Sequence, residues 1–387
     1  MTIHSGFSTA NGTPARGVGV EFAPSDEQVF FQETTRKFLS AECPIPVVRS
    51  LESAPAGYDA PYWRQGAELG WTSLLVPAEA GGGSLSGEGL MDLVLVAEEM
   101  GRMVSPGPLA PVNVVASAVA AGGSAAQQAA VLPGLLSGET VAAWCGERPV
   151  EGVIDGENLV LSGRVSPVEA GAQAQHLLVA ARTPRGLMQV LVPGAAPRVT
   201  VTPLGGLDLV RRFAEVHFDG VVTTPAERIG VAGDAAAAVE HQLQIACVLQ
   251  CAETVGAMSR VFEMTLEYLS DRYSFGRPLA SYQALKHRMA DNKMWLESSH
   301  AVMTAAAGAV AGGSPAAGEI VSAAKAWIGP HATELIQDCV QLHGGIGVTW
   351  EHDLHLYLRR TTVNRVTHGT PEYHAERIAT QLLGTAS

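Results

Sequence analysis

The sequence predicts an α+β protein with three folded parts in chain order: a helical N-terminal domain, a middle antiparallel β-domain and a C-terminal helical bundle. Three observations lead to this prediction. The chain has 387 residues, more than one compact core usually organises. Apolar residues recur at helical spacing before residue 140 and again after residue 230. Between these stretches, short β-rich runs are separated by Gly, Pro, Asp and Asn.

We place the boundaries at residues 1–24, 25–139, 140–230 and 231–387. Residues 1–24 are rich in Gly, Ser, Thr and Pro and hold no apolar core of signal-peptide length, so we expect a loose tail. Apolar residues make up 47% of the chain and charged residues 16%, which indicates a well-buried globular protein. No continuous apolar run is long enough to span a bilayer, so we expect a soluble protein.

The N-terminal domain is expected to begin with a helix that Ser25 or Asp26 caps. Its apolar stripe runs from Val29 to Leu39, and Pro44 ends it. Two more helices are expected at 62–69 and 87–103. The predicted strands of the middle domain are 141–144, 159–161, 177–181, 188–192, 199–202 and 214–218, and their regular spacing indicates an antiparallel sheet or small barrel.

The C-terminal domain is expected to consist of long, Ala-rich helices over 234–312 and 316–342, with a separate helix at 283–303 and a kink at Pro330. Such helices favour an antiparallel bundle. Apolar stripes on more than one face predict a subunit contact in addition to the local core.

Charge and cysteine content exclude several classes of protein. A net charge of −13 gives no reason to expect nucleic acid and argues against an anionic membrane surface. Five cysteines are scattered, which predicts reduced thiols in a cytoplasmic protein. Cys247 and Cys251 lie one helical turn apart, and His352 and His355 share a helix face, but packing and an exposed polar face are the better interpretations, so we expect no metal.

Two stretches of the C-terminal part carry the functional signal. They are Arg272-Tyr-Ser-Phe-Gly-Arg-Pro-Leu-Ala-Ser-Tyr-Gln283 and Gln341-Leu-His-Gly-Gly345. The glycine pair closes a helix and leaves bare backbone N–H groups that a large flat or phosphorylated ligand can approach; the alternative is a simple helix-turn-helix corner. As a pair, the stretches resemble the R-x-x-F-G-x-P…Q and Q-x-x-G-G segments of the acyl-CoA dehydrogenase family. The likeness extends in weaker form from about residue 25.

The resemblance implies an enzyme that desaturates an acyl-CoA thioester at the 2,3-position and passes the β-hydride to FAD. It also implies a homo- or heterotetramer, because both segments hold the FAD of a neighbouring subunit, and an acceptor of the electron-transfer flavoprotein type. The FAD contacts carried over from the family are Arg272, Ser274, Phe275, Tyr282, Gln283, Gln341, Gly344, Gly345 and Thr370. The Arg272 guanidinium suits a pyrophosphate, and the alternative is an ion pair with Asp271 or Glu267.

The catalytic base departs from the family pattern. Many members carry a Glu immediately before a Gly-Thr pair near the C-terminus, where this chain has His368. Others carry the Glu on the first long helix of the C-terminal domain, at a position that matches about Ala246. A histidine side chain is suited in general to proton abstraction near neutral pH, which makes His368 a candidate base, and the alternative is a helix-start residue without chemistry. Glu253, two turns beyond Ala246, is a fallback base, and the alternative is a solvated or ion-paired residue.

The middle domain departs as well. The family's T-E-P-x-x-G-S-D loop is here Gly146-Glu-Arg-Pro-Val-Glu-Gly152, which keeps Glu147. The Trp and Thr that lie against the flavin ring in the family fall near Pro167 and Glu169. An actinobacterial subgroup with a similar H-G-G-I-G-x-T-W-E-H-D-x-H-L-Y run forms heterotetramers that share one flavin site and act on bulky CoA esters. Three hypotheses follow: an active homotetramer, one subunit of a heteromeric dehydrogenase, or a flavin-free structural subunit.

Overall fold

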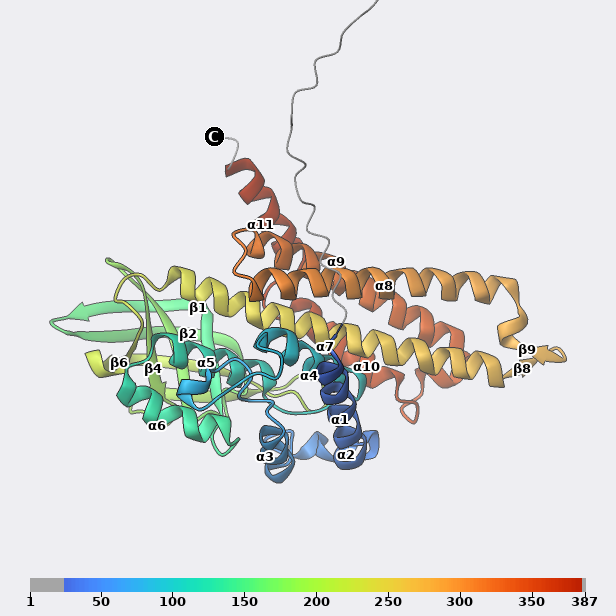
Figure 1. Cartoon of the computed structure of the whole chain (residues 1–387), viewed down its shortest axis with the longest axis horizontal. Helices are drawn as coiled ribbons and strands as arrows, with labels where there is room; N and C mark the ends of the chain where they lie inside the picture. The colour runs from blue at the N-terminus through green and yellow to red at the C-terminus, as the bar shows by residue number, and fades with distance from the viewer. Residues whose placement is uncertain (1–23, 385–387) are drawn as a thin grey trace, which may run out of the picture.

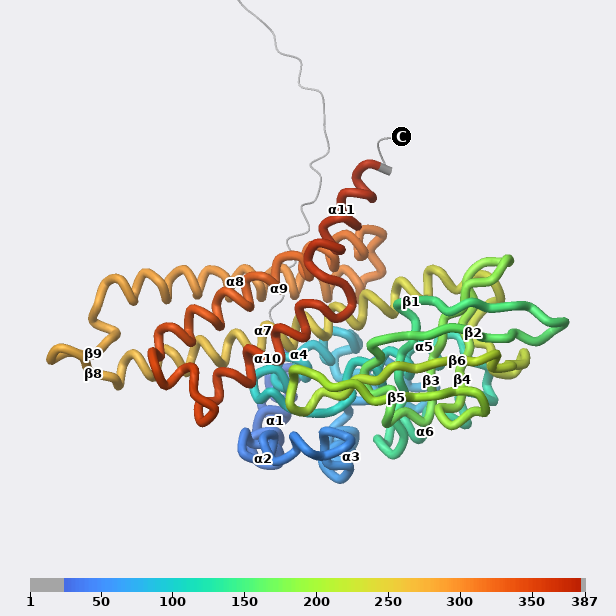
Figure 2. The backbone as a smooth tube through the Cα atoms, turned by 180° about the vertical axis from the view of Figure 1, so that it is seen from behind, coloured from blue at the N-terminus to red at the C-terminus, as the bar shows by residue number. Residues whose placement is uncertain are grey.

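A computed structural model describes residues 24–384, so the predicted N-terminal tail lies outside the described residues except for Pro24. Long helices form a bundle along the molecule. The β-domain lies at one end of this bundle, and a small hairpin lies at the other (Figure 1). The view from behind shows the same arrangement (Figure 2).

The N-terminal domain is helical, as predicted. Its helices are α1 (Asp26–Glu42), α2 (Ile45–Ser50), α3 (Ala60–Glu68), α4 (Gly89–Arg102), α5 (Leu109–Gly122) and α6 (Ala125–Leu136). Ser25 caps α1 in a capping box with Gln28, which satisfies two backbone N–H groups that a helix start leaves free. The side chain of Gln28 also bonds the buried carboxylate of Asp92 at 2.8 Å and thereby ties α1 to α4.

The middle domain is one seven-stranded sheet with the strand order β5-β6-β2-β1-β3-β4-β7. Its strands are β1 (Ala142–Asp155), β2 (Asn158–Glu169), β3 (His176–Thr183), β4 (Gly186–Pro193), β5 (Val199–Leu204), β6 (Phe213–Thr223) and β7 (Arg228–Ile229). The prediction of a purely antiparallel sheet is wrong at one place, because β1 and β3 are parallel, with Ala142 beside His176. β2 returns along one edge of β1, and the chain then crosses to the other edge, so β3 must run in the direction of β1.

The C-terminal domain is a helical bundle, as predicted. Its elements are α7 (Ala236–Asp271), β8 (Tyr273–Ser274), β9 (Arg277–Pro278), α8 (Gln283–Ala311), α9 (Ala317–His343), α10 (Leu354–Val366) and α11 (Pro371–Gly384). The helix α9 continues through Pro330. By length and composition α7 can cross a membrane, but 94% of its most apolar window is buried inside the protein. We therefore interpret α7 as the core helix of the bundle.

The N-terminal domain and the bundle meet where α4 crosses α7. A Cβ on Gly101 would lie 1.9 Å from the Glu253 carbonyl oxygen, and a Cβ on Gly256 would lie 1.9 Å from the Glu98 carbonyl oxygen. Only glycine permits this close approach of two helix backbones. The crossing brings Glu253 next to loops of the β-domain.

Candidate functional site

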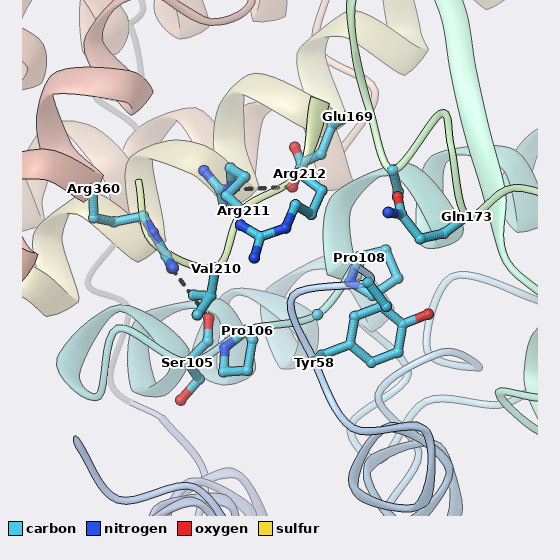
Figure 3. A pocket seen from close by; sticks show the side chains of 13 residues that line it. Tyr58, Ser105, Pro106, Pro108, Glu169, Gln173, Val210, Arg211, Arg212 and Arg360 are labelled. Carbon is cyan, nitrogen blue, oxygen red and sulfur yellow. Dashed lines mark hydrogen bonds and ion pairs between the residues drawn. The ribbon is translucent and has the colours of Figure 1, made fainter. Parts of the chain in front are cut away.

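The three domains enclose a crevice at this crossing, which contains several cavities of about 20 Å³ each. One cavity lies against Leu109, Leu249 and Glu253, and a second lies against Trp144, Glu147 and Pro167; His368 lines both. A third is bounded by Tyr58, Pro108 and Arg211, among others (Figure 3). A volume of this size holds about one water molecule.

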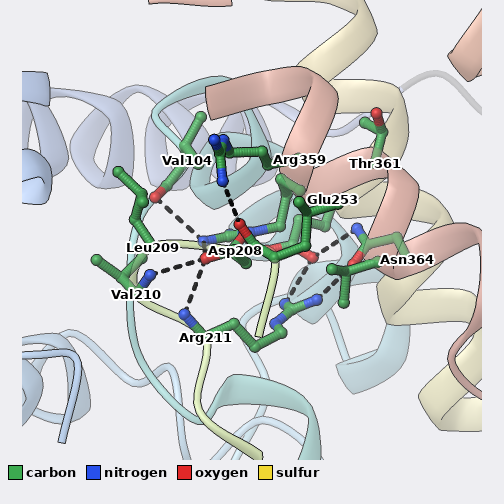
Figure 4. A network of polar contacts seen from close by, with 12 residues as sticks. Val104, Asp208, Leu209, Val210, Arg211, Glu253, Arg359, Thr361 and Asn364 are labelled. Atoms are coloured by element: carbon green, nitrogen blue, oxygen red, sulfur yellow. Dashed lines mark hydrogen bonds and ion pairs between the residues drawn. The ribbon is translucent and has the colours of Figure 1, made fainter. Parts of the chain in front are cut away.

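Charged side chains fill the centre of the crevice (Figure 4). The Glu253 carboxylate accepts hydrogen bonds from Arg211 at 2.7 Å, Arg360 at 2.6 Å and Asn364 at 2.9 Å. Arg360 also donates to Asp208 and to the Ser105 carbonyl, the latter at 3.1 Å. These residues come from α7, α10, the loop between β5 and β6 and, for Ser105, the loop between α4 and α5. The network therefore joins all three domains.

A second carboxylate neutralises Arg211. The Arg211 Nε atom lies 3.1 Å from Glu169, the residue at the end of β2 near which the resemblance puts the family's Thr. Both Arg211 and Arg360 are buried, so each guanidinium needs carboxylate partners to offset its loss of hydration. Two arginines thus face three carboxylates inside the protein.

The pairing holds the carboxylates in the ionised form. Burial acts to raise the pKa of Glu253, but Arg211 and Arg360 outweigh this effect and leave its pKa below the usual range. Burial opposes ionisation of Asp208 in the same way, and Arg360 with Arg211 lowers its pKa to about 2. A carboxylate held by two arginines and an amide is a poor proton acceptor. The geometry therefore favours the ion-paired interpretation of Glu253 over its role as a fallback base.

His368 stands at the opposite wall of the crevice, in a backbone turn with φ of +60°, a conformation that non-glycine residues rarely adopt. Its Nδ1 atom lies 3.2 Å from Glu147 Oε2, and its ring lies 5.8 Å from the Trp144 ring. Burial acts to raise the pKa of Glu147, but the hydrogen bond with His368 and the nearby cations Arg148 and Lys325 outweigh this effect and leave the pKa lowered. Glu147, the one residue kept from the family loop, thus orients the imidazole.

Buried polar groups anchor the backbone around His368. The Lys325 ammonium donates to the carbonyls of Asn364 at 2.8 Å and Thr367 at 2.9 Å, which closes the C-terminal end of α10. His374 Nε2 bonds the His368 carbonyl at 2.9 Å. These bonds allow the turn to keep its unusual backbone conformation.

The crevice does not fit a flavin ring as it stands. Pro167 and Glu169, near which the resemblance puts the Trp and Thr that contact the ring in the family, line one of the cavities, and Glu169 is bound to Arg211. The cavities beside them hold about 20 Å³ each. A tricyclic ring would have to separate the Arg211–Glu169 pair, which leaves the Glu169 carboxylate without this partner while Arg211 keeps Glu253.

The predicted FAD contacts lie elsewhere, at the end of the bundle that is remote from the β-domain (Figure 2). Arg272, Phe275, Gln283, Gln341, Gly344 and Gly345 are exposed, while Ser274 and Tyr282 are partly buried. We call these eight residues the clamp. Thr370 does not join them, because it follows His368 and bonds the Tyr373 backbone at the start of α11.

The clamp contains groups that suit a phosphate. The Arg272 side chain has no ion pair among the described residues, and Glu267 pairs with Arg260 at 3.6 Å. A Cβ on Gly344 or Gly345 would meet no atom within 4 Å, so their backbone is open on that side. An unpaired guanidinium and bare peptide groups are suited to a pyrophosphate. The residues at this end therefore fit part of an FAD molecule.

The clamp and the crevice of one chain are far apart. Glu253 and Arg272 both follow the axis of α7, separated by 19 residues. At about 1.5 Å per residue, this separation is about 28 Å. The clamp of this chain does not reach its own crevice.

Some of these residues were missed in the sequence. Arg211, Arg360, Asp208 and Lys325 carried no motif, and only the Arg211-Arg212 and Arg359-Arg360 pairs in otherwise apolar stretches were a possible signal. Glu147 was noticed, but its pairing with His368 was not. Among residues 24–384, no three His, Cys, Asp or Glu side chains are grouped as metal ligands.

Known proteins resemble this chain over most of its length. The profile "Acyl-CoA dehydrogenase, N-terminal domain" matches residues 25–139, and "Acyl-CoA dehydrogenase, C-terminal domain" matches residues 234–383. Acyl-CoA dehydrogenase IpdE2 of Mycobacterium tuberculosis is 30% identical over 343 residues, which cover 87% of this chain and 91% of that protein.

Two solved structures share the fold. The Tcur3481–Tcur3483 steroid ACAD has a TM-score of 0.84 and 28% identity, covering 93% of this chain and 99% of that one. The ChsE4–ChsE5 complex from Mycobacterium tuberculosis has a TM-score of 0.85 and 25% identity, covering 94% and 99%. The chain thus belongs to the acyl-CoA dehydrogenase family, whose members oxidise acyl-CoA thioesters with FAD.

Proposed function

We propose that this chain is one subunit of a heteromeric acyl-CoA dehydrogenase, in which its clamp holds the FAD of an unlike partner subunit. The partner supplies the catalytic carboxylate, and the crevice of this chain is closed to flavin. The observation that carries the proposal is the contrast between the two ends of α7. Six of the eight clamp residues are exposed, and Arg272 has no ion pair among the described residues, whereas the crevice is occupied by Arg211, Arg360 and their carboxylates.

The surface around the clamp supports a subunit contact. Large apolar side chains are exposed there, with Phe275 96% exposed and Val348 77% exposed. A soluble chain usually covers such side chains with a partner. Two of the similar structures name pairs of chains, the Tcur3481–Tcur3483 steroid ACAD and the ChsE4–ChsE5 complex. By analogy we propose a heterotetramer in the cytoplasm that acts on a bulky acyl-CoA and passes electrons to an electron-transfer flavoprotein.

FAD supplies the hydride acceptor in this assembly, and the residues of this chain supply only binding. Arg272 and the amides of Gly344 and Gly345 would hold a negatively charged part of the cofactor. The exposed Gln283 and Gln341 would offer amide groups, and Phe275 an aromatic surface. Proton transfer from the acyl group belongs to the partner in this proposal.

The test is co-expression with an acyl-CoA dehydrogenase chain that keeps a Glu at the position of His368 or of Ala246. We expect the chain purified alone to be colourless and the co-purified complex to be yellow, with fewer flavins than chains. Arg272→Ala should remove flavin from the complex, while His368→Ala should leave both flavin content and turnover unchanged. A yellow homomer with one flavin per chain, bleached by an acyl-CoA ester, would contradict the proposal.

A second candidate function rests on the Glu147–His368 pair. Glu147 occupies Nδ1 of the imidazole, which leaves Nε2 free to accept a proton at the wall of the crevice. In that case the chain is active as a homotetramer. Loss of turnover in both His368→Ala and Glu147→Gln, with flavin content retained, would favour this candidate over the first.

A further inference from the structure

The two halves of the clamp are 58 residues apart in the sequence, from Gln283 to Gln341, and something must set their relative position. Arg272 follows the last turn of α7, and its backbone N–H bonds the Tyr268 carbonyl at 2.9 Å. Tyr268 therefore lies one helical turn below Arg272. On the other side, His343 is the last residue of α9 and immediately precedes Gly344.

Tyr268 and His343 make two separate contacts. Their rings are stacked with centroids 4.4 Å apart and planes 24° apart. The Tyr268 hydroxyl donates a hydrogen bond of 3.1 Å to the His343 carbonyl, one of the carbonyls that the end of α9 leaves without a helical partner. One contact fixes the side chain of His343, and the other fixes the peptide group that enters the Gly344 turn.

The His343 ring is held from the remaining sides as well. Its Nδ1 atom lies 2.8 Å from the Cys339 carbonyl, so Nδ1 carries the proton and donates it. The ring of His352 meets it edge-on, with centroids 4.8 Å apart. Gly344 has φ of 64° and ψ of −140°, a conformation open essentially to glycine alone. A Cβ on Gly344 or Gly345 would meet no atom within 4 Å, so neighbouring atoms do not enclose these two residues. The contacts of His343 therefore set the position of the Gly344–Gly345 corner.

We propose that Tyr268 and His343 form a clasp that positions the Gly344–Gly345 corner relative to Arg272, so that both halves of the clamp face one ligand. The inference rests on the proposed function, since it names the residues that position the same FAD contacts. Tyr268 and His343 are positioning residues, because the Tyr268 hydroxyl and the His343 Nδ1 atom are both bonded within the chain.

The surroundings of His343 favour its neutral form. Burial lowers the pKa of His343, the Cys339 carbonyl opposes this shift, and His352 adds to it. The groups that face the ring are Tyr268 from α7, Cys339 from α9 and His352 from the turn before α10. His352 in turn lies near Asp353, His355 and Arg49, and Asp353 is paired with Arg49 at 2.9 Å. Protonation of His343 places a cation beside His352 and against the exposed Gly344 peptide.

The experiment measures hydrogen exchange of residues 341–349 in the whole chain and FAD binding by fluorescence quenching. The variants are Tyr268→Phe, which keeps the stack and loses the hydroxyl, and Tyr268→Leu, which loses both. Tyr273→Phe on the neighbouring hairpin is the matched control, because its ring is exposed. Where the chain alone binds no FAD, the titration uses the co-purified complex after removal of its flavin.

We expect Tyr268→Leu to raise exchange in residues 341–349 about tenfold and to weaken FAD binding about tenfold, with Tyr268→Phe about threefold in both, since loss of one hydrogen bond is worth about 1 kcal/mol or less here. Exchange elsewhere in α7 and α9 should not change. On acidification below the ordinary pKa range of histidine, protection of the corner should fall in the parent chain and stay constant in His343→Phe.

Each outcome has a distinct meaning. If Tyr268→Leu folds normally and leaves both the corner exchange and the FAD affinity unchanged, the clasp is refuted. If exchange rises but FAD affinity does not change, the pair only stabilises the fold, and the positioning role is refuted. If neither Tyr268→Leu nor Arg272→Ala changes FAD affinity, both the clasp and the proposed function are refuted. If Arg272→Ala weakens FAD binding and Tyr268→Leu does not, only the clasp is refuted.

Discussion

At the scale of single residues, buried neighbours fix the charge state of the groups around the crevice. His374 is 1% exposed, and its Nε2 atom is occupied by the His368 carbonyl. Burial lowers the pKa of His374 to about 4, although the His368 carbonyl opposes the shift. The imidazole is therefore neutral in the folded chain over a pH range in which it is protonated after unfolding.

This difference predicts a loss of stability in acid. Between pH 6.5 and about 4, the unfolded chain binds a proton at His374 and the folded chain does not, so stability falls as the pH falls through this range. The contribution is on the order of 3 kcal/mol. Urea unfolding at several pH values should show that His374→Gln, which keeps a donor but does not titrate, removes a drop of this order. An identical pH dependence in both proteins would refute the assignment.

The ion pairs around Glu253 predict a coupled response to substitution. Glu253→Gln leaves Arg211 and Arg360 with one charged partner fewer in a buried site, and we expect it to cost about 3–5 kcal/mol. Arg211→Met should cost a similar amount. The double variant should cost less than the sum by more than about 1 kcal/mol, because each substitution removes the partner that the other leaves behind. Additive effects in urea unfolding would show that the charges act independently.

At the scale of elements, the crossing of α4 and α7 decides how closely the N-terminal domain approaches the bundle. The reciprocal glycines Gly101 and Gly256 let each backbone touch the other helix. Helix axes normally pack 8–10 Å apart, and side chains set that spacing. Here the absence of two side chains lets the two backbones touch, and Glu253 lies at the point of contact.

Gly256→Ala should therefore separate the two helices. The added Cβ would lie 1.9 Å from the Glu98 carbonyl oxygen, so the backbone must shift. We expect a loss of at least about 2–3 kcal/mol in thermal or urea unfolding. Gly308→Ala is the control, since a Cβ at this position in α8 meets no atom within 4 Å. That substitution should stabilise the chain by about 0.5–1 kcal/mol, and equal effects of the two would contradict the interpretation of the crossing.

At the scale of the whole molecule, α7 separates two functions. One end of α7 leads into the β8–β9 hairpin (Figure 1), where the clamp lies, and Glu253 in the middle of α7 lines the crevice. A chain that bound one FAD molecule with its own clamp and its own crevice would need the two sites close together. The separation of about 28 Å is consistent with the proposed assembly, in which the clamp of this chain serves the flavin of a second subunit.

A substitution in the clamp should therefore change flavin content but not stability, and a substitution in the crevice should change stability but not flavin content. Arg272→Ala removes an exposed side chain without an ion pair, so stability should change by less than about 0.5 kcal/mol while the flavin-to-protein absorbance ratio of the complex falls. Glu253→Gln should lower stability and leave that ratio unchanged in the surviving folded protein. A fall in flavin content with Glu253→Gln and none with Arg272→Ala would place the flavin in the crevice instead.

The sequence alone predicted the order of the three domains, each of the six named strands and the helical bundle. It did so because helices and strands follow from local periodicity, Gly and Pro positions and capping residues such as Ser25. The two clamp motifs are continuous stretches of sequence, so they could be recognised without the structure, and they identified the family. The roles of the individual clamp residues remain a proposal.

Contacts between residues that are far apart in the sequence could be seen only in the tertiary structure. Glu253 meets Arg211 across 42 residues of sequence, and Glu147 meets His368 across 221. The same is true of the parallel β1–β3 pair, which depends on which edge of β1 the chain reaches after β2. A helix periodicity shows on which face Glu253 lies, but not which charges the other domains bring to that face. For this reason the sequence identified the family, and the fold showed that the crevice is closed while the clamp is open.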